Sequence, residues 1–163
     1  MARGLAGAAL AAALLTWAVL AGATGWGGIT PGETMRRDVE ARFGKPSGER
    51  TIAEEGRTAV EWTYAGDKAP KGLDRMVVGF GLVKNGLFQP DVVRVFTLYP
   101  RPGVFPARTI VGGWGKPDAI GTDEQTGRPA FRYDAKGLLV ILDKSGEWAE
   151  LMVFAPEQPG AKP

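Results

Sequence analysis

Two chemically versatile residue types are missing from the 163-residue sequence, which contains no cysteine and no histidine. Their absence excludes thiolate nucleophiles, disulfide bonds and imidazole bases, and it removes the usual ligands of zinc. Serine is also scarce, because Ser47 and Ser145 are the only two and each lies in a glycine-adjacent turn. The sequence therefore indicates no catalytic residues, no metal site and no cofactor.

A surplus of charge of one sign is lacking as well. The chain has 20 Lys and Arg against 18 Asp and Glu, a net charge of +2, and the charges are scattered along the sequence. Nucleic-acid binding requires a basic stripe or patch, and no such stripe is visible. The hydrophobic content of 44% is high enough for a folded core, so the composition is not that of a disordered chain.

The N-terminal residues 1–23 have the pattern of a secretory signal peptide. Arg3 precedes an Ala/Leu-rich apolar run from Leu5 to Leu20, and Ala21-Gly22-Ala23 supplies small residues for cleavage after Ala23. The run is shorter than the roughly 20 residues of a spanning helix. We therefore expect a periplasmic or secreted protein, with an uncleaved inner-membrane anchor as the alternative. Bacterial lipoproteins carry their lipidated cysteine where Ala23 stands, so no lipid anchor is expected.

A repeated motif organises the rest of the chain. Phe43-Gly44-Lys45-Pro46 recurs as Trp114-Gly115-Lys116-Pro117, and each copy is preceded at the same distance by a Pro-Gly pair, Pro31-Gly32 and Pro102-Gly103. Two matches in the same register indicate a tandem duplication. We read repeat 1 at 24–100 and repeat 2 at 101–157, followed by a disordered tail at 158–163 that is rich in proline, glycine and lysine.

Each repeat is predicted to begin with a helix. In repeat 1, Thr30 and Glu33 have the spacing of a capping box and predict a helix over 31–43. In repeat 2, a helix over 106–113 starts at Pro106. Alternating and apolar runs after each helix predict strands, among them 76–83 and 92–98, with a turn at Asn85-Gly86. The predicted fold class is α+β, with two tandem helix-plus-antiparallel-strand repeats that share one sheet and place their helices on one face.

Part of this pattern resembles a known family. Gly28-Ile29-Thr30, Phe43-Gly44-Lys45-Pro46, Trp62-Thr63-Tyr64 and Val78-Gly79-Phe80 resemble the motifs of the SmpA/OmlA small outer-membrane lipoproteins. Two such units in one chain look like the β-lactamase inhibitory protein. The resemblance implies helices packed on one face of a continuous antiparallel sheet, with the other face open for protein binding.

The strongest candidate for a binding surface is the last predicted strand, over 148–154. If side chains alternate regularly, every second residue from position 148 to position 154 lies on one face of this strand. Ala149, Leu151 and Val153 then lie on the opposite face. A strand that is apolar on both sides must cover its second face with a partner or with the rest of a bent sheet, and both readings stay open. The candidate binding residues are Trp148, Glu150, Met152 and Phe154.

The function predicted from these features is that of an exported bacterial envelope protein, a non-enzymatic module that binds another envelope protein. One alternative is a carboxylate-dependent hydrolase, and another is a membrane-anchored structural subunit of the envelope. The acids that could serve the hydrolase, or a calcium site, cluster in repeat 2 and are Asp118, Asp123, Glu124 and Asp134. Their spacing matches no calcium-loop motif, and glycines around them indicate a solvated loop.

Overall fold

The computed structural model of the chain describes residues 24–54 and 56–157. The predicted signal peptide at 1–23 and the predicted tail at 158–163 lie outside these described residues. Among the residues that are described, no helix has both the length and the apolar character needed to cross a membrane.

The described residues form two α-helices, eight strands and two short 3₁₀ turns. The first half of the chain contains α1 (Arg36–Phe43), β1 (Gly48–Glu54), β2 (Arg57–Ala65), η1 (Gly66–Lys68), β3 (Leu73–Lys84) and β4 (Leu87–Pro100). The second half contains α2 (Ala107–Trp114), β5 (Ala119–Thr122), β6 (Pro129–Tyr133), η2 (Asp134–Lys136), β7 (Leu138–Leu142) and β8 (Ala149–Phe154).

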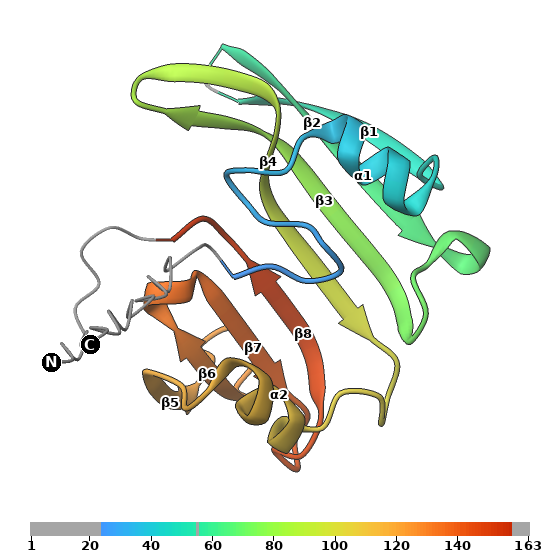
Figure 1. The fold of residues 1–163 in the computed structure, drawn as a ribbon. Coiled ribbons are helices and arrows are strands. Elements are labelled where there is room, and N and C mark those ends of the chain that lie inside the picture. The colour runs from blue at the N-terminus through green and yellow to red at the C-terminus, as the bar shows by residue number, and fades with distance from the viewer. Residues whose placement is uncertain (1–23, 55, 158–163) are drawn as a thin grey trace, which may run out of the picture.

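All eight strands belong to one antiparallel sheet with the order β1-β2-β3-β4-β8-β7-β6-β5 (Figure 1). Neighbouring strands in the sequence are joined by hairpins, except that β4 lies beside the last strand, β8. Phe96, Thr97 and Leu98 of β4 pair there with Phe154, Val153 and Met152 of β8. This pairing joins the two halves of the chain into a continuous sheet.

The predicted fold class was wrong. The molecule is mostly one eight-stranded sheet with two short helices, and two tandem helix-plus-strand repeats do not describe it. The reason is the relative size of the elements. Strands β3 and β4 have 12 and 14 residues, so β4 extends over roughly 45 Å, whereas each helix has eight residues and is about 12 Å long. Each helix therefore fully buries a single residue, Val39 or Ile110.

Helix α1 begins at Arg36, five residues later than the predicted start. Its N-cap is Met35, whose backbone N–H donates to the carboxylate of Asp38 at 3.1 Å. The preceding residues form backbone hydrogen bonds with β4 instead. The N–H of Gly32 donates to the carbonyl of Val93, and the N–H of Val93 donates to the carbonyl of Thr34. Tertiary hydrogen bonds to β4 thus hold 31–34 in a turn, and the Thr30 capping box does not form.

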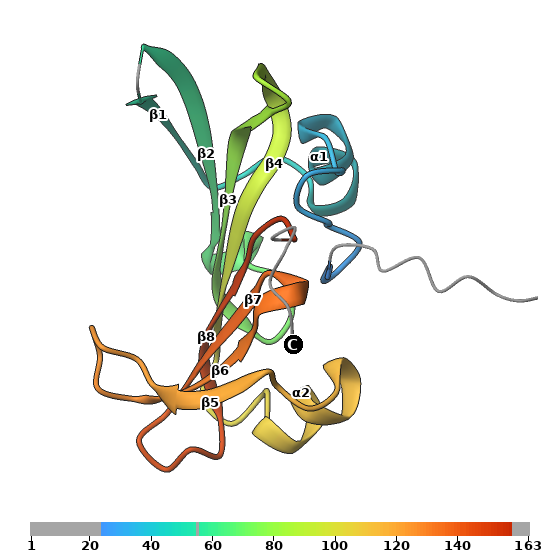
Figure 2. The ribbon, with the colours of Figure 1, turned by 90° about the vertical axis from the view of Figure 1, so that its left-hand side faces the viewer.

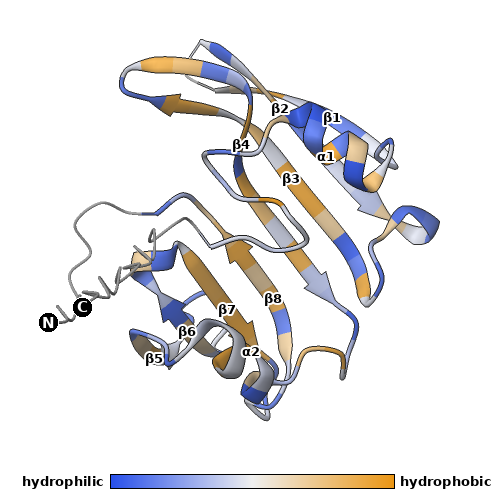
Figure 3. Cartoon of the chain, viewed as in Figure 1, coloured by the Kyte–Doolittle hydropathy of each residue, from blue (hydrophilic) through white to orange (hydrophobic). Residues whose placement is uncertain are grey.

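The hydrophobic core lies between the sheet and the two helices. Figure 3 shows hydrophobic residues gathered on β3, β7 and β8, while the edge strand β1 is more hydrophilic. Alternate residues of the central strands point into this core. Those with no exposed surface include Tyr64, Met76, Val78, Phe96, Leu98, Val140, Met152 and Phe154.

On the opposite face of the sheet, the described residues provide no helical cover. In the edge-on view of Figure 2, α1 and α2 lie on the same side of the sheet, and the described residues place no helix on the other side. We call this second side the uncovered face. Because side chains alternate along a strand, the residues between the core positions point to it.

Candidate functional site

One row of side chains crosses the uncovered face over six strands. The strand pairings place its members side by side, and all but the last are half-buried although neither α1 nor α2, the α-helices of the described residues, packs on them. From β2 to β6, this central row consists of Thr63, Val77, Thr97, Val153, Leu139 and Arg132. The uncovered face is therefore mixed in chemistry, with hydroxyl and apolar side chains alternating at its middle.

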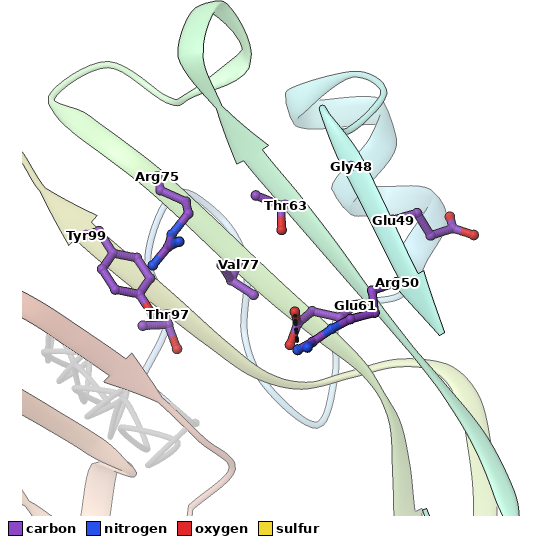
Figure 4. A pocket seen from close by; sticks show the side chains of 9 residues that line it. All are labelled: Gly48, Glu49, Arg50, Glu61, Thr63, Arg75, Val77, Thr97 and Tyr99. Atoms are coloured by element: carbon purple, nitrogen blue, oxygen red, sulfur yellow. Dashed lines mark hydrogen bonds and ion pairs between the residues drawn. The ribbon is translucent and has the colours of Figure 1, made fainter. Parts of the chain in front are cut away.

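A concavity of about 530 Å³ lies over β1–β4 on this face, and we call it the Arg75 pocket (Figure 4). It includes the Thr63, Val77 and Thr97 part of the central row. Arg75 and Tyr99 are cross-strand partners at one side of it, and the Arg75 guanidinium lies 3.9 Å from the centre of the Tyr99 ring. This is a close cation–π contact, which holds the long arginine side chain in one place.

The other charged residues around the Arg75 pocket offset one another or turn away. Arg50 and Glu61 form an ion pair at 2.9 Å within the pocket. Glu49 points away from the other side chains in Figure 4, and its carboxylate accepts a hydrogen bond of 2.6 Å from the indole of Trp62 in the core. Within the described residues Arg75 makes no hydrogen bond or ion pair. The two arginines and two glutamates of the lining balance in charge, and Arg75 is the one of the four that has neither an ion pair nor a hydrogen bond within the described residues.

A second concavity, of about 470 Å³, lies at the start of β8, and we call it the Trp148 pocket. Two of the four predicted binding residues, Trp148 and Glu150, line it together with Pro100, Pro102, Gly103, Asp143 and Ala149. The backbone on both sides of Trp148 is fixed, because Ala107 donates to the carbonyl of Glu147, and Ala149 donates to that of Phe105. Glu150 forms an ion pair with Arg128.

The other two predicted binding residues, Met152 and Phe154, have no exposed surface and belong to the core. The prediction that all four share a face was wrong. The cause is a bulge in β8, where the pairing with β7 shifts between Leu151 and Ala149. One extra residue reverses the alternation of side chains, so Ala149 lies on the core face with Met152 and Phe154.

The structure does not gather the acids of the hydrolase hypothesis into one site. Asp123 accepts hydrogen bonds from the hydroxyl and the backbone N–H of Thr126, at 2.7 and 2.8 Å, and these bonds lower the pKa of Asp123. Asp134 instead receives bidentate hydrogen bonds from Arg132 and lines a small concavity of about 240 Å³ with it. Asp118 and Glu124 are exposed. Across 24–54 and 56–157, no cluster of three or more acids is placed to hold a metal.

The sequence analysis missed Arg75 and Tyr99. Each lies just outside the predicted apolar runs, at 76–83 and 92–98, and neither belongs to a motif. Their pairing depends on the register between β3 and β4, which contains bulges that no local pattern reveals. The alternation of side chains along a strand could have placed them. On paired strands, the residues next to core residues all point to the face of the sheet that lies opposite the core.

Comparison with known proteins gives one structural neighbour. No family model matches the chain, and no curated protein matches it. The chain is similar in structure to a DUF4309 family protein (YjgB) from Bacillus subtilis subsp. subtilis str. 168, with 16% identity and a TM-score of 0.48. The match covers 80% of this chain and 83% of the neighbour.

The resemblance to the SmpA/OmlA lipoproteins and to the β-lactamase inhibitory protein was wrong, because no family model matches the chain and the described residues form one eight-stranded sheet with two short helices. The residues that carried the resemblance have structural roles. Gly44 ends α1 with a positive φ of 75°, while Trp62 and Tyr64 are core residues of β2. Helix ends and buried aromatics of this kind occur in many sheets with a packed helix, so their spacing is a poor marker of one family.

Proposed function

We propose that this chain is a non-enzymatic protein-binding module of the bacterial envelope, and that its uncovered face is the surface that binds the partner. The single observation that carries the proposal is the absence of helical cover, in the described residues, over a face that has half-buried Val77, Val153 and Leu139 at its centre. Apolar side chains that are left without a cover mark interaction surfaces. Two concavities on the molecule provide positions for side chains of the partner.

Trp148 is the proposed anchor for an apolar side chain of the partner. Tryptophan is enriched among the residues that dominate binding energy, especially where it lines a well-packed pocket. The prolines Pro100 and Pro102 beside it are rigid and lose little conformational entropy on binding. We therefore expect a partner protein that inserts an apolar side chain between the indole and these prolines.

Site-specific photo-crosslinking tests this proposal. A photoreactive amino acid at Thr97, on the uncovered face, should give a discrete adduct with one envelope protein in the cells that express the chain. The same group at Arg37, which is exposed on α1, serves as the control for the covered side. The Thr97 adduct should disappear in Trp148→Ala. Equal adducts from both positions, or a Thr97 adduct that is insensitive to Trp148→Ala, would contradict the proposal.

The export part of the proposal rests on residues 1–23. Sequencing the N-terminus of the mature protein from the envelope fraction should give Thr24 as the first residue, because Ala21-Gly22-Ala23 has the small-residue pattern of a cleavage site. An intact N-terminus in washed membranes would instead indicate the anchored form. This result is independent of the crosslinking test, which concerns the partner surface alone.

A further inference from the structure

We infer that the Arg75 pocket binds one carboxylate of the partner protein, an Asp or Glu side chain, and that Arg75 supplies the charge for it. This inference rests on the proposed function, in which the uncovered face is the partner surface. It adds the chemistry of the partner: an acidic residue near the apolar side chain that enters the Trp148 pocket. The argument depends on how Arg75 is held, on the charge around it, and on the hydroxyl groups beside it.

Arg75 is held ready for a planar anion. Its guanidinium lies on the face of the Tyr99 ring, 3.9 Å from the ring centre. A cation–π contact uses no hydrogen-bond donor, so the N–H groups of the guanidinium remain available for paired hydrogen bonds with a carboxylate. Because Arg75 has no hydrogen bond or ion pair within the described residues, a partner carboxylate displaces no existing contact.

The charge of the pocket fits a monoanion. Arg50 pairs with Glu61 at 2.9 Å and Glu49 is bonded to the Trp62 indole, so Arg75 is the one charged lining residue with neither an ion pair nor a hydrogen bond within the described residues. A phosphate group with two charges would meet one free arginine and the nearby Glu61 carboxylate, and it would remain partly unpaired. A single carboxylate pairs one to one with Arg75 and brings less negative charge near Glu61 than a phosphate does. The chemistry therefore favours an acidic protein side chain over a phosphate.

Hydroxyl groups supply further donors around the same point. Figure 4 shows Thr97 and Tyr99 next to each other on β4, with Thr63 across Val77 on β2. The Tyr99 hydroxyl has no hydrogen bond within the described residues. A hydroxyl can rotate to donate to an incoming oxygen, so these groups add hydrogen bonds without adding charge.

The two pockets adjoin along the chain, because Tyr99 lines the Arg75 pocket and the next residue, Pro100, lines the Trp148 pocket. We expect one partner segment to contact both. At about 530 Å³ the Arg75 pocket is larger than one carboxylate side chain, so it also accommodates backbone of that segment. The expected partner motif is an acidic residue close to an apolar one.

Titration of the isotope-labelled protein by NMR tests the carboxylate site. The probe is a capped tetraglutamate peptide, and capped tetraglutamine is the neutral control. We expect saturable shifts of the Arg75 Nε–H signal and of the Thr63 and Thr97 amides with tetraglutamate only. The shifts should weaken at high salt, since a charge interaction at an exposed site is screened. No saturable shift, equal shifts with tetraglutamine, or tighter binding of inorganic phosphate than of tetraglutamate would overturn the inference.

Variants assign the effect to Arg75. Arg75→Gln should weaken tetraglutamate binding at least tenfold, and Arg75→Lys, which keeps the charge but loses the planar fork, at least threefold. The matched control is Arg101→Gln, because Arg101 is also exposed but already faces Asp74 at 3.5 Å. It should bind like the parent protein. Equal weakening by Arg75→Gln and Arg101→Gln would show a nonspecific charge effect and would overturn the inference.

The crosslinking experiment separates this inference from the proposed function. If the Thr97 adduct forms and depends on Trp148 but is unchanged in Arg75→Gln, the face binds a partner and the carboxylate site is wrong. If the adduct is absent from Thr97 while tetraglutamate binds at Arg75, the anion site stands and the protein-binding function fails. Exposed Arg75 is not part of the core, so its variants should keep the amide spectrum of the folded protein.

Discussion

The hydroxyl of Tyr64 donates a hydrogen bond of 3.0 Å to the carbonyl oxygen of Gly44, the residue that ends α1. Tyr133 makes the same contact, also at 3.0 Å, with Gly115 at the end of α2. Helix ends leave carbonyl groups without partners, and each tyrosine satisfies one of them from the sheet below. The two aromatic-Gly-Lys-Pro motifs thus end helices whose last turns are tied to strands β2 and β6.

Tyr64→Phe should therefore give a pH-dependent change in stability. Burial, reinforced by the carboxylate of Glu40, raises the pKa of Tyr64 to about 12. Since this exceeds the value of about 10 expected in the unfolded chain, the neutral phenol stabilises the fold below pH 10, and this contribution is lost as the pH rises toward 12. At pH 8 we expect the variant to be about 1 kcal/mol less stable.

Urea denaturation from pH 8 to 11.5 measures the gap in the free energy of unfolding between the parent protein and Tyr64→Phe. The gap should narrow above pH 10 and then reverse, because the parent protein alone loses the contribution of the neutral phenol. A gap that stays constant over this range would contradict the raised pKa of Tyr64.

Because of the bulge in β8, alanine substitution of Phe154 and of Trp148 should affect stability and partner binding in opposite ways. Phe154 stacks on Phe96 with ring centres 4.4 Å apart and has no exposed surface, so Phe154→Ala should cost about 3 to 5 kcal/mol. Trp148 is half-buried at a pocket, and Trp148→Ala should change stability by about 1 kcal/mol or less while abolishing the Thr97 adduct. Thermal unfolding of both variants checks this, and a larger loss for Trp148→Ala would assign Trp148 to the core.

Two glycines with positive φ should respond differently to alanine. Gly86 has φ 76° and open space where a Cβ would stand, so Gly86→Ala should cost about 1 kcal/mol of backbone strain. Gly137 has φ 60°, but its added Cβ would collide with the backbone carbonyl of Ala155 and lie 2.8 Å from that of Pro156. Backbone cannot move aside as a side chain can, so Gly137→Ala should cost about 2 kcal/mol more than Gly86→Ala. Equal melting temperatures for the two variants would contradict this packing.

The start of α1 can be tested by its cap. Asp38 accepts the Met35 N–H, and its negative charge lies in the first turn, so Asp38→Ala should destabilise the protein by roughly 0.5 to 1 kcal/mol. Thr30→Ala should cost less, because in the observed turn it is the side chain of Thr34 that accepts a hydrogen bond from the Thr30 backbone. The reverse order in urea denaturation would support a helix that starts at residue 31.

Local features were predictable from the sequence because neighbouring residues determine them. The Asn85-Gly86 turn is confirmed, since Lys84 pairs with Leu87 across it and both turn residues have positive φ. The second helix, predicted over 106–113, is found at Ala107–Trp114. The first helix was misplaced at its start because long-range hydrogen bonds to Val93 compete with the local cap, and a sequence pattern contains no information on that competition.

What the sequence by itself determined is the chemistry that is missing, the glycine and proline positions where helices and hairpins end, and the alternating residues that become the core of each strand. Only the tertiary structure decided that β4 pairs with β8, that a bulge sends Met152 and Phe154 into the core, and that Arg75 lies on Tyr99. Turns and helix ends depend on backbone preferences within a few residues. Strand pairing and register depend on packing between residues far apart in the chain, and a shift of one residue exchanges the core face for the uncovered one.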